Sequence, residues 1–153
     1  MKHTTVCYLI KHSPELEVLL GLKKVGFGRG KYAGIGGKVE AGESIAEAAI
    51  REVEEEIGVK IPINSIQHMG IVSFLFPSKV EWNQEVSIFT THNWQGEPIE
   101  SEEMKPFWFK FADIPYQSMW QDNRFWLPQI LDGNKLNLTI SFKNDNETVD
   151  EVF

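Results

Sequence analysis

The stretch that decides the fold begins at residue 37 and ends at residue 59. It opens as Gly37-Lys38-Val39-Glu40-Ala41-Gly42-Glu43 and, after seven residues, continues as Arg51-Glu52-Val53-Glu54-Glu55-Glu56-Ile57-Gly58-Val59. Between Ser44 and Ile57 there is no Pro or Gly, and apolar residues recur at helical spacing. Ser44 and Glu47 have the spacing of a capping box, and Gly58 provides a stop signal. The sequence therefore predicts a helix over residues 44–57.

Three glutamates fall on one face of this helix. Residues three and four apart share a helical face, so Glu52, Glu55 and Glu56 are expected to converge. Like charges at this spacing destabilise a helix by roughly 0.2 to 0.5 kcal/mol per pair unless a cation neutralises them. Carboxylate oxygens suit Mg²⁺ or Mn²⁺. A glutamate triplet taken alone is more often a solvated helix face, so its context decides between the two interpretations.

That context is a resemblance to the Nudix hydrolases, whose sequence box this stretch matches at every defined position. The resemblance implies a Mg²⁺-dependent hydrolase, with Mn²⁺ as the alternative ion. It implies that Arg51 orients the glutamates by ion pairing and that Glu43 belongs to the same site. The metal ligands that it implies are Gly37, Glu52, Glu55, Glu56 and Glu103.

The chemistry implied by the resemblance is attack of water on a phosphoryl centre. Bound metal ions neutralise phosphate oxygens and lower the pKa of a bound water. One carboxylate accepts the proton, and the sequence leaves Glu52 and Glu56 as alternatives. Lys23 or Lys24 is a candidate phosphate contact, with a solvated lysine as an equal alternative. Glu103 lies in an acidic run and has a surface carboxylate as its alternative.

Beyond the box, the chain resembles the oxidised-purine nucleoside triphosphate hydrolases, which cleave damaged nucleotides to the monophosphate and pyrophosphate. The resemblance rests on Val18-Leu19-Leu20-Gly21, Lys23-Lys24, Gly26-Phe27-Gly28, Glu103-Met104-Lys105-Pro106, Trp108-Phe109, Met119-Trp120-Gln121-Asp122 and Phe125-Trp126. It implies an aromatic pocket for the base, because such side chains stack on a purine. The matching positions are Phe27, Phe74, Phe76, Met104, Trp120 and Trp126. For Phe74, Phe76 and Trp126 a place in the core is an equal alternative, whereas Trp120 favours the pocket.

Polar groups at the base edge determine which purine is accepted. The family places two neighbouring aspartates there, and this chain has Asp122 followed by Asn123. Ala33 stands where the family has an asparagine, and Tyr32 where it has a tryptophan. An Asp/Asn pair presents a fixed amide donor and acceptor, so we expect a narrower or shifted substrate range. Candidate substrates are 8-oxo-dGTP and 2-hydroxy-dATP.

The predicted fold class is α+β, the Nudix fold, in which a mixed sheet has helices packed on both faces. Segments rich in β-branched and aromatic residues predict strands. They cover residues 4–10, 17–22, 66–76, 84–91, 106–111 and 136–142, with a polar turn at residues 12–14. A shorter helix is expected over residues 122–131, where Pro128 removes one backbone donor. Residues 1–153 are expected to form one domain.

Composition limits the function classes. The net charge of -7 and the lack of a dense Lys/Arg cluster argue against nucleic-acid binding and RNA-end processing. No apolar run reaches membrane length and Cys7 is the single cysteine, so we expect a cytoplasmic protein without an intramolecular disulfide or membrane association. We expect a monomer, although no sequence feature determines the oligomeric state. The expected partner is a small nucleotide. Alternatives are a Nudix enzyme for another nucleotide or a dinucleoside polyphosphate, and a non-catalytic nucleotide-binding module.

Overall fold

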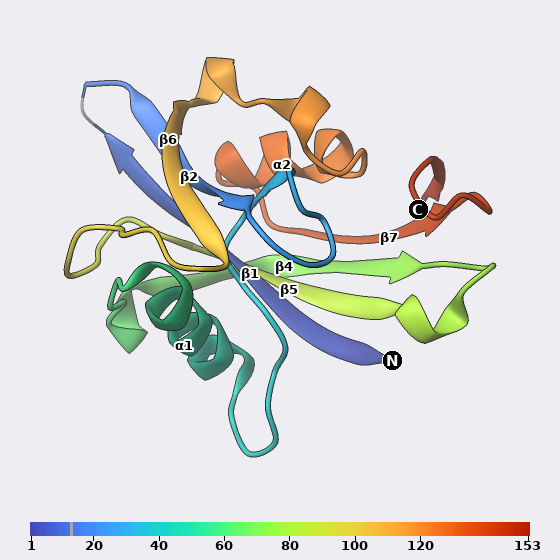
Figure 1. Ribbon diagram of the computed structural model, residues 1–153, viewed down its shortest axis with the longest axis horizontal. Coiled ribbons are helices and arrows are strands. Elements are labelled where there is room, and N and C mark those ends of the chain that lie inside the picture. The colour runs from blue at the N-terminus through green and yellow to red at the C-terminus, as the bar shows by residue number, and fades with distance from the viewer. Residues whose placement is uncertain (13) are drawn as a thin grey trace.

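The computed structural model describes residues 1–12 and 14–153. Its strands are β1 (Lys2–His12), β2 (Leu16–Lys23), β3 (Tyr32–Ala33), β4 (Ile66–Leu75), β5 (Gln84–Thr91), β6 (Met104–Lys110), β7 (Leu136–Phe142) and β8 (Val149–Val152). Its helices are α1 (Ile45–Ile57) and α2 (Asn123–Leu131), and four short 3-10 turns join the elements. Figure 1 shows α1 and α2 on opposite sides of the sheet.

The sheet is mixed, as predicted. Seven of its eight described strands follow the order β3-β2-β1-β5-β4-β7-β8, and the eighth, β6, pairs with β2 outside this path. Strand β1 runs parallel to β5 and antiparallel to β2, while β4 runs antiparallel to β5 and parallel to β7. With a helix on each face, this arrangement confirms the predicted α+β sandwich.

The central strand β1 shows why both faces carry a helix. Successive side chains of a strand point to opposite faces, and residues 7–10 of β1 are all buried. Cys7 and Leu9 belong to the core cluster that includes α1, whereas Tyr8 and Ile10 belong to the cluster that includes α2. A strand that is buried on both faces requires cover on both.

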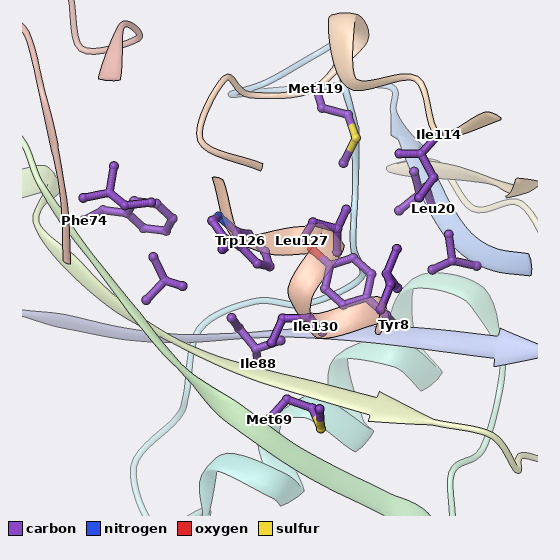
Figure 2. Close-up of a cluster of buried hydrophobic side chains, with 14 of the residues drawn as sticks. Tyr8, Leu20, Met69, Phe74, Ile88, Ile114, Met119, Trp126, Leu127 and Ile130 are labelled. Carbon is purple, nitrogen blue, oxygen red and sulfur yellow. The ribbon is translucent and has the colours of Figure 1, made fainter. Parts of the chain in front are cut away.

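Helix α2 covers one face with an apolar side. Trp126, Leu127 and Ile130 are buried, and the Trp126 ring meets the Tyr8 ring edge-on at 6.2 Å between centroids. Figure 2 shows these side chains directed from α2 toward Tyr8 and Ile88 of the sheet. This contact fixes the start of α2, and with it residues 120–123, against the sheet.

The signals at the ends of α1 form as predicted. The Glu47 backbone N–H donates to the Ser44 side chain at 3.1 Å, and the Ser44 backbone N–H donates to the Glu47 carboxylate at 2.8 Å. Gly58 ends the helix with a φ of 72°, a left-handed conformation that costs glycine little. The prediction of a helix over residues 44–57 is thereby confirmed.

The other predicted elements are also present, with small differences at their ends. Strands β5 and β7 have the predicted bounds, and β1 and β2 form an antiparallel pair. Ser13, in the predicted turn, lies outside the described residues. Strands β3 and β8 were not predicted, because they are only two and four residues long. In the described part of the chain, neither helix has the length and apolar character needed to span a bilayer.

Candidate active site

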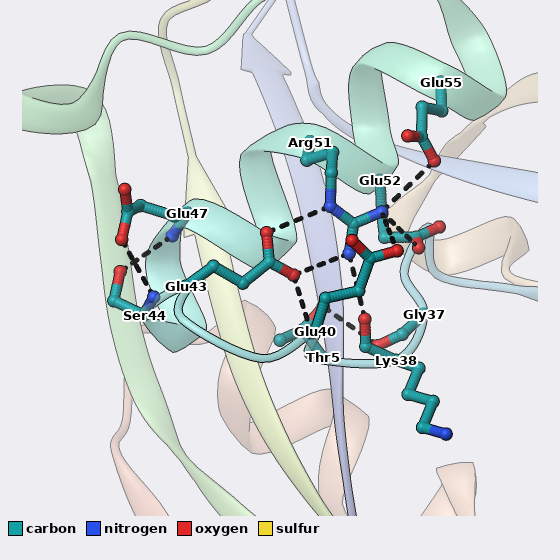
Figure 3. Close-up of polar contacts among 10 residues, drawn as sticks. All are labelled: Thr5, Gly37, Lys38, Glu40, Glu43, Ser44, Glu47, Arg51, Glu52 and Glu55. Carbon is teal, nitrogen blue, oxygen red and sulfur yellow. Dashed lines mark hydrogen bonds and ion pairs between the residues drawn. The ribbon is translucent and has the colours of Figure 1, made fainter.

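The site is organised around Arg51, which α1 carries at its centre. Its Nε and Nη2 donate to the two carboxylate oxygens of Glu43 at 3.0 and 2.7 Å, a bidentate pair. Its Nη1 donates to Glu52 at 2.9 Å and to Glu55 at 3.2 Å, and Nη2 also donates to the Lys38 carbonyl at 3.0 Å. Figure 3 shows this fan of contacts between the helix and the preceding loop. Arg51 therefore fixes the loop and two glutamates relative to one another.

Glu43 is held more tightly than the other carboxylates of the site. Besides the Arg51 pair, it accepts a hydrogen bond from the Glu40 backbone N–H at 2.8 Å. The hydrogen bonds from Arg51, and then the one from Glu40, lower the pKa of Glu43 below its usual value. Glu43 thus stays ionised and closes the loop of residues 40–43 onto α1.

Gly37 approaches the Glu52 carboxylate closely. A Cβ atom at this position would lie 2.6 Å from both Glu52 oxygens, so any residue other than glycine would clash with the carboxylate. The Gly37 carbonyl accepts the Thr5 backbone N–H at 2.8 Å, which ties this loop to β1. The Thr5 hydroxyl also donates to this oxygen at 3.5 Å, so the predicted role of Gly37 as a metal ligand requires this longer hydrogen bond to be replaced.

Glu56 lies at the centre of the carboxylate group. Burial raises its pKa to about 7, and the nearby charges of Glu52, Glu103 and Glu55 raise it as well, while Lys23 opposes them. Glu103 and Lys23 are thus close enough to Glu56 for their charges to act on it, and their roles as metal ligand and phosphate contact stay predictions. Among the described residues, the buried Oε2 of Glu56 has no hydrogen-bond partner.

These donors have the chemistry that a divalent cation needs. The carboxylates are hard oxygen ligands, and a cation would satisfy the orphaned oxygen of Glu56 and offset the like charges around it. Within residues 1–12 and 14–153, however, no three acidic, His or Cys side chains are arranged as a ready metal cage. One cause is visible: Glu52 and Glu55 each bind Arg51. The metal-ligand roles stay predictions.

A cavity of about 320 Å³ lies beside this group. It is lined by Thr4, Thr5, Val6, Tyr8, Phe27, Ala33, Gly34, Gly36, Gly37, Phe74, Phe76, Gln84, Val86, Trp120, Asp122, Asn123, Trp126, Phe142 and Asn146. Most of the lining is apolar and aromatic, as in sites for planar ligands. Gly37 belongs both to the cavity wall and to the contact with Glu52. The cavity therefore leads to the carboxylates.

Aromatic side chains form the mouth of the cavity. Phe27 is 65% exposed and stacks on Trp120 at 5.1 Å between centroids. It also meets Trp82, in the 3-10 turn Val80–Trp82, edge-on at 5.3 Å. Phe74, Phe76 and Trp126 belong to the core cluster and also line the cavity. For these three residues, a place in the core and a place in the pocket are therefore not exclusive.

Asp122 and Asn123 bring polar atoms into this apolar wall. Both are buried, and Asp122 accepts the Trp126 indole N–H at 2.9 Å. Burial raises the pKa of Asp122 to about 6 although this hydrogen bond lowers it. Asn123 donates its side-chain amide to the Trp120 carbonyl at 2.9 Å, which leaves its oxygen for other partners.

Met104 departs from the prediction. It does not line the cavity but is buried in the cluster that packs against α1. The register of β6 on β2 explains this position, because it places the Met104 side chain over Gly21 and next to Ile35 on the α1 side of the sheet. Conversely, Gln84, Phe142 and Asn146 line the cavity although no motif marked them.

Residues 1–130 match the family model described as the NUDIX domain. This chain belongs to the Nudix family. The Nudix box is the loop and helix that Arg51 joins, and the Nudix fold accounts for a sheet covered on both faces. The match ends within α2, so strands β7 and β8 and the turn with Asn146 lie beyond it.

Two curated relatives of this Nudix chain carry the name oxidized purine nucleoside triphosphate hydrolase. The protein from Danio rerio is 46% identical over 114 residues, which are 74% of this chain and 71% of the relative. The protein from Mus musculus is 40% identical over 132 residues, or 86% of this chain and 82% of the relative. The crystal structure of a MutT protein from Bacillus halodurans is 26% identical, with a TM-score of 0.84 over 100% of this chain and 97% of that one.

Proposed function

We propose that this Nudix enzyme hydrolyses oxidised purine nucleoside triphosphates to the monophosphate and pyrophosphate and so removes damaged nucleotides from the pool. One observation carries the proposal. An aromatic cavity large enough for a purine meets, at Gly37, a partly buried group of carboxylates around Glu56. The names of the Danio rerio and Mus musculus relatives support the same substrate class.

In this proposal the cavity binds the base. Phe27 and Trp120 stack with an interplanar angle of 19° at its mouth, a geometry suited to contact with a flat ring. Asp122 and Asn123 supply the polar atoms that meet the base edge, because a buried donor or acceptor rejects ligands that leave it unpaired. With the base held there, the phosphates extend past Gly37 toward α1.

The carboxylates bind the metal and move the proton. Gly37, Glu52, Glu55, Glu56 and Glu103 would hold a divalent ion, which would supply neutralisation of phosphate charge and a lower pKa for a bound water. Glu52 and Glu56 are the two candidate proton acceptors, because both belong to the carboxylate group on α1. Arg51 positions the glutamates through its hydrogen bonds, and Lys23 supplies positive charge for the phosphates.

The proposal includes Mg²⁺ as the ion and a monomer as the active form. Nudix hydrolases as a family need a divalent metal ion, and oxygen ligands favour Mg²⁺ over softer ions. Comparison of rates with Mg²⁺, Mn²⁺ and Ca²⁺ tests the first point. Light scattering at assay concentration tests the second, because a dimer would have twice the mass of the 17.5 kDa chain.

The experiment is a substrate panel. Purified protein is incubated with Mg²⁺ and 8-oxo-dGTP, 2-hydroxy-dATP, dGTP, dATP or a dinucleoside polyphosphate, and pyrophosphate and monophosphate are quantified. We expect the oxidised purines to be hydrolysed fastest and Glu56→Gln to abolish turnover. Glu54→Gln is the matched control, because Glu54 is exposed on the same helix outside the carboxylate group.

The outcomes separate the alternatives. Fastest turnover of an unmodified nucleotide or of the dinucleoside polyphosphate would keep the chemistry and refute the substrate class. Nucleotide binding without release of pyrophosphate would instead indicate a binding module. Equal loss of activity in Glu54→Gln and Glu56→Gln would contradict the assignment of the carboxylate group as the catalytic centre.

A further inference from the structure

Polar atoms from different parts of the fold face the cavity with different hydrogen-bonding character. Its lining includes four side chains with both used and available polar atoms: Gln84, Asp122, Asn123 and Asn146. On α2 and the residue before it, the protein uses one oxygen of Asp122 and the amide nitrogen of Asn123. The atoms that remain there, one oxygen of each side chain, are acceptors when Asp122 is ionised.

Gln84 has the opposite polarity. It is the first residue of β5, between Lys2 of β1 and Phe74 of β4. The Thr4 hydroxyl donates to the Gln84 side-chain oxygen at 3.0 Å. With its oxygen engaged, the amide group is fixed in orientation, and no residue in the described ranges accepts a hydrogen bond from its nitrogen. Both N–H donors of the Gln84 amide therefore remain available to the cavity, while one lone pair of its oxygen is engaged by Thr4.

Asn146 repeats this polarity from the turn between β7 and β8. The Ser78 hydroxyl donates to its side-chain oxygen at 2.8 Å, which leaves the amide nitrogen for the cavity. Asn146 is the one non-glycine residue with a left-handed backbone among those described, at a φ of 60°. This conformation is uncommon outside glycine and is tolerated best by Asn and Asp. Figure 1 shows the C-terminal segment at the same end of the sheet as the β4–β5 connection.

We propose that Gln84, oriented by Thr4 and assisted by Asn146, is a specificity-determining residue that donates a hydrogen bond to the C8 carbonyl oxygen of an 8-oxopurine. This inference rests on the proposed function and narrows its substrate class. The acceptors of Asp122 and Asn123 complement the N–H groups on the pyrimidine-ring edge of guanine. The donors of Gln84 and Asn146 then remain for the far edge of the base.

The chemistry at that far edge explains how oxidation would be recognised. At this edge an unmodified purine has a C8–H group, which accepts no hydrogen bond, and an acceptor at N7, whereas an 8-oxopurine has an acceptor at the C8 carbonyl oxygen and an N7–H donor. A donor directed at the C8 position therefore pairs only with the 8-oxopurine. A donor left unpaired in an apolar cavity loses its hydration without replacement. This loss corresponds to roughly a tenfold lower affinity for a ligand without the carbonyl, and more when burial is complete. Aromatic stacking alone does not make this distinction, because both bases have the same ring faces.

The test measures binding of product analogues without metal, so it is independent of hydrolysis. Titration calorimetry compares 8-oxo-dGMP, 8-bromo-dGMP and dGMP, of which 8-bromo-dGMP carries a bulky C8 substituent without a carbonyl. Wild-type protein is expected to bind 8-oxo-dGMP tightest. Gln84→Met, which keeps the side-chain length, is expected to lose about tenfold in affinity for 8-oxo-dGMP and little for the other two. Gln84→Glu is expected to lose at least as much, because a carboxylate faces the carbonyl.

Two further variants complete the test. Thr4→Val frees the amide of Gln84 while preserving shape, so we expect a smaller loss confined to 8-oxo-dGMP. Gln67→Met is the matched control on β4, because Gln67 is exposed and does not line the cavity. Circular dichroism verifies that each variant is folded.

The inference is overturned if folded Gln84→Met binds 8-oxo-dGMP like wild type, or loses the same factor for all three ligands. It is also overturned if wild type does not distinguish 8-oxo-dGMP from dGMP. Failure of the proposed function is a different result: no release of pyrophosphate from 8-oxo-dGTP with Mg²⁺, whatever the affinities for the monophosphates.

Discussion

Replacement of either of two adjacent glycines in the loop before α1 by alanine is predicted to have different effects. Gly37→Ala should lower activity, and Gly36→Ala should lower stability. Neither Gly36 nor Gly37 has a positive φ, so the backbone itself accepts an alanine at both positions. At Gly37 the new methyl group would lie 2.6 Å from both Glu52 oxygens. Comfortable carbon–oxygen contacts begin at about 3.3 Å, so the Glu52 oxygens must move by about 0.7 Å, and the carboxylate carbon, which lies still closer to the methyl group, by about 1 Å.

The consequence of that movement is functional. The end of a glutamate side chain moves easily, so Gly37→Ala is expected to change the free energy of unfolding by less than about 1 kcal/mol. A displacement of about 1 Å at a catalytic group costs about a hundredfold in rate, and kcat/KM for 8-oxo-dGTP should fall by this factor. Affinity for the metal ion should fall by about 10 to 100-fold as its ligand is moved.

Gly36→Ala is the comparison. Its methyl group would overlap the Thr5 backbone carbonyl of β1, which moves only with the strand. The free energy of unfolding should therefore fall by at least about 2 kcal/mol, as in overpacked cores. Urea unfolding, kcat/KM and metal titration are measured for both variants. The reasoning is refuted if Gly37→Ala keeps wild-type activity and metal affinity, or if it unfolds as easily as Gly36→Ala.

Three further predictions concern neighbouring residues. Arg51→Lys loses the bidentate contact with Glu43 and is expected to lower kcat/KM by about 10 to 100-fold at fixed Mg²⁺, a result that unchanged kinetics would contradict. Asp122 has its pKa raised from 3.8 to about 6 in the folded protein, so its protonated form stabilises the fold below pH 3.8 and that contribution is lost as pH rises to 6. Between pH 3.8 and 6, the free energy of unfolding of wild type, measured with urea, should therefore fall by about 3 kcal/mol relative to that of Asp122→Asn. Equal pH dependence of the two proteins would refute this prediction. Ser44→Ala removes the side-chain cap of α1 and should lower the free energy of unfolding by about 0.5 to 2 kcal/mol without changing kcat, so a loss of kcat in folded protein would be the contrary result.

Local signals explain what the sequence predicted well. The bounds of α1 follow from Ser44, Glu47 and Gly58, all of which act within one turn of the helix. The bounds of β5 follow from its own run of β-branched and aromatic residues. The Arg51 network was expected from the box, and its partners lie within thirteen residues along the chain.

Contacts between distant segments explain what the sequence could not predict. Gln84 and Asn146 line the cavity because of the pairing of β5 with β1 and the placement of the β7–β8 turn beside Ser78. Met104 fails as a pocket residue because the β6–β2 register directs it to the α1 side, and a strand residue changes faces with a register shift of one. The Glu56 oxygen that lacks a partner among residues 1–12 and 14–153 depends on packing that no local pattern encodes.

The most direct test of the central claim is a competition assay. Equal concentrations of 8-oxo-dGTP and dGTP are mixed with the enzyme and Mg²⁺, both well below KM, and each nucleotide is followed by chromatography. The ratio of the two decay constants is the ratio of kcat/KM values. We predict that 8-oxo-dGTP disappears at least about tenfold faster and yields 8-oxo-dGMP and pyrophosphate. Equal decay of the two nucleotides, faster loss of dGTP, or release of orthophosphate in place of pyrophosphate would contradict the account.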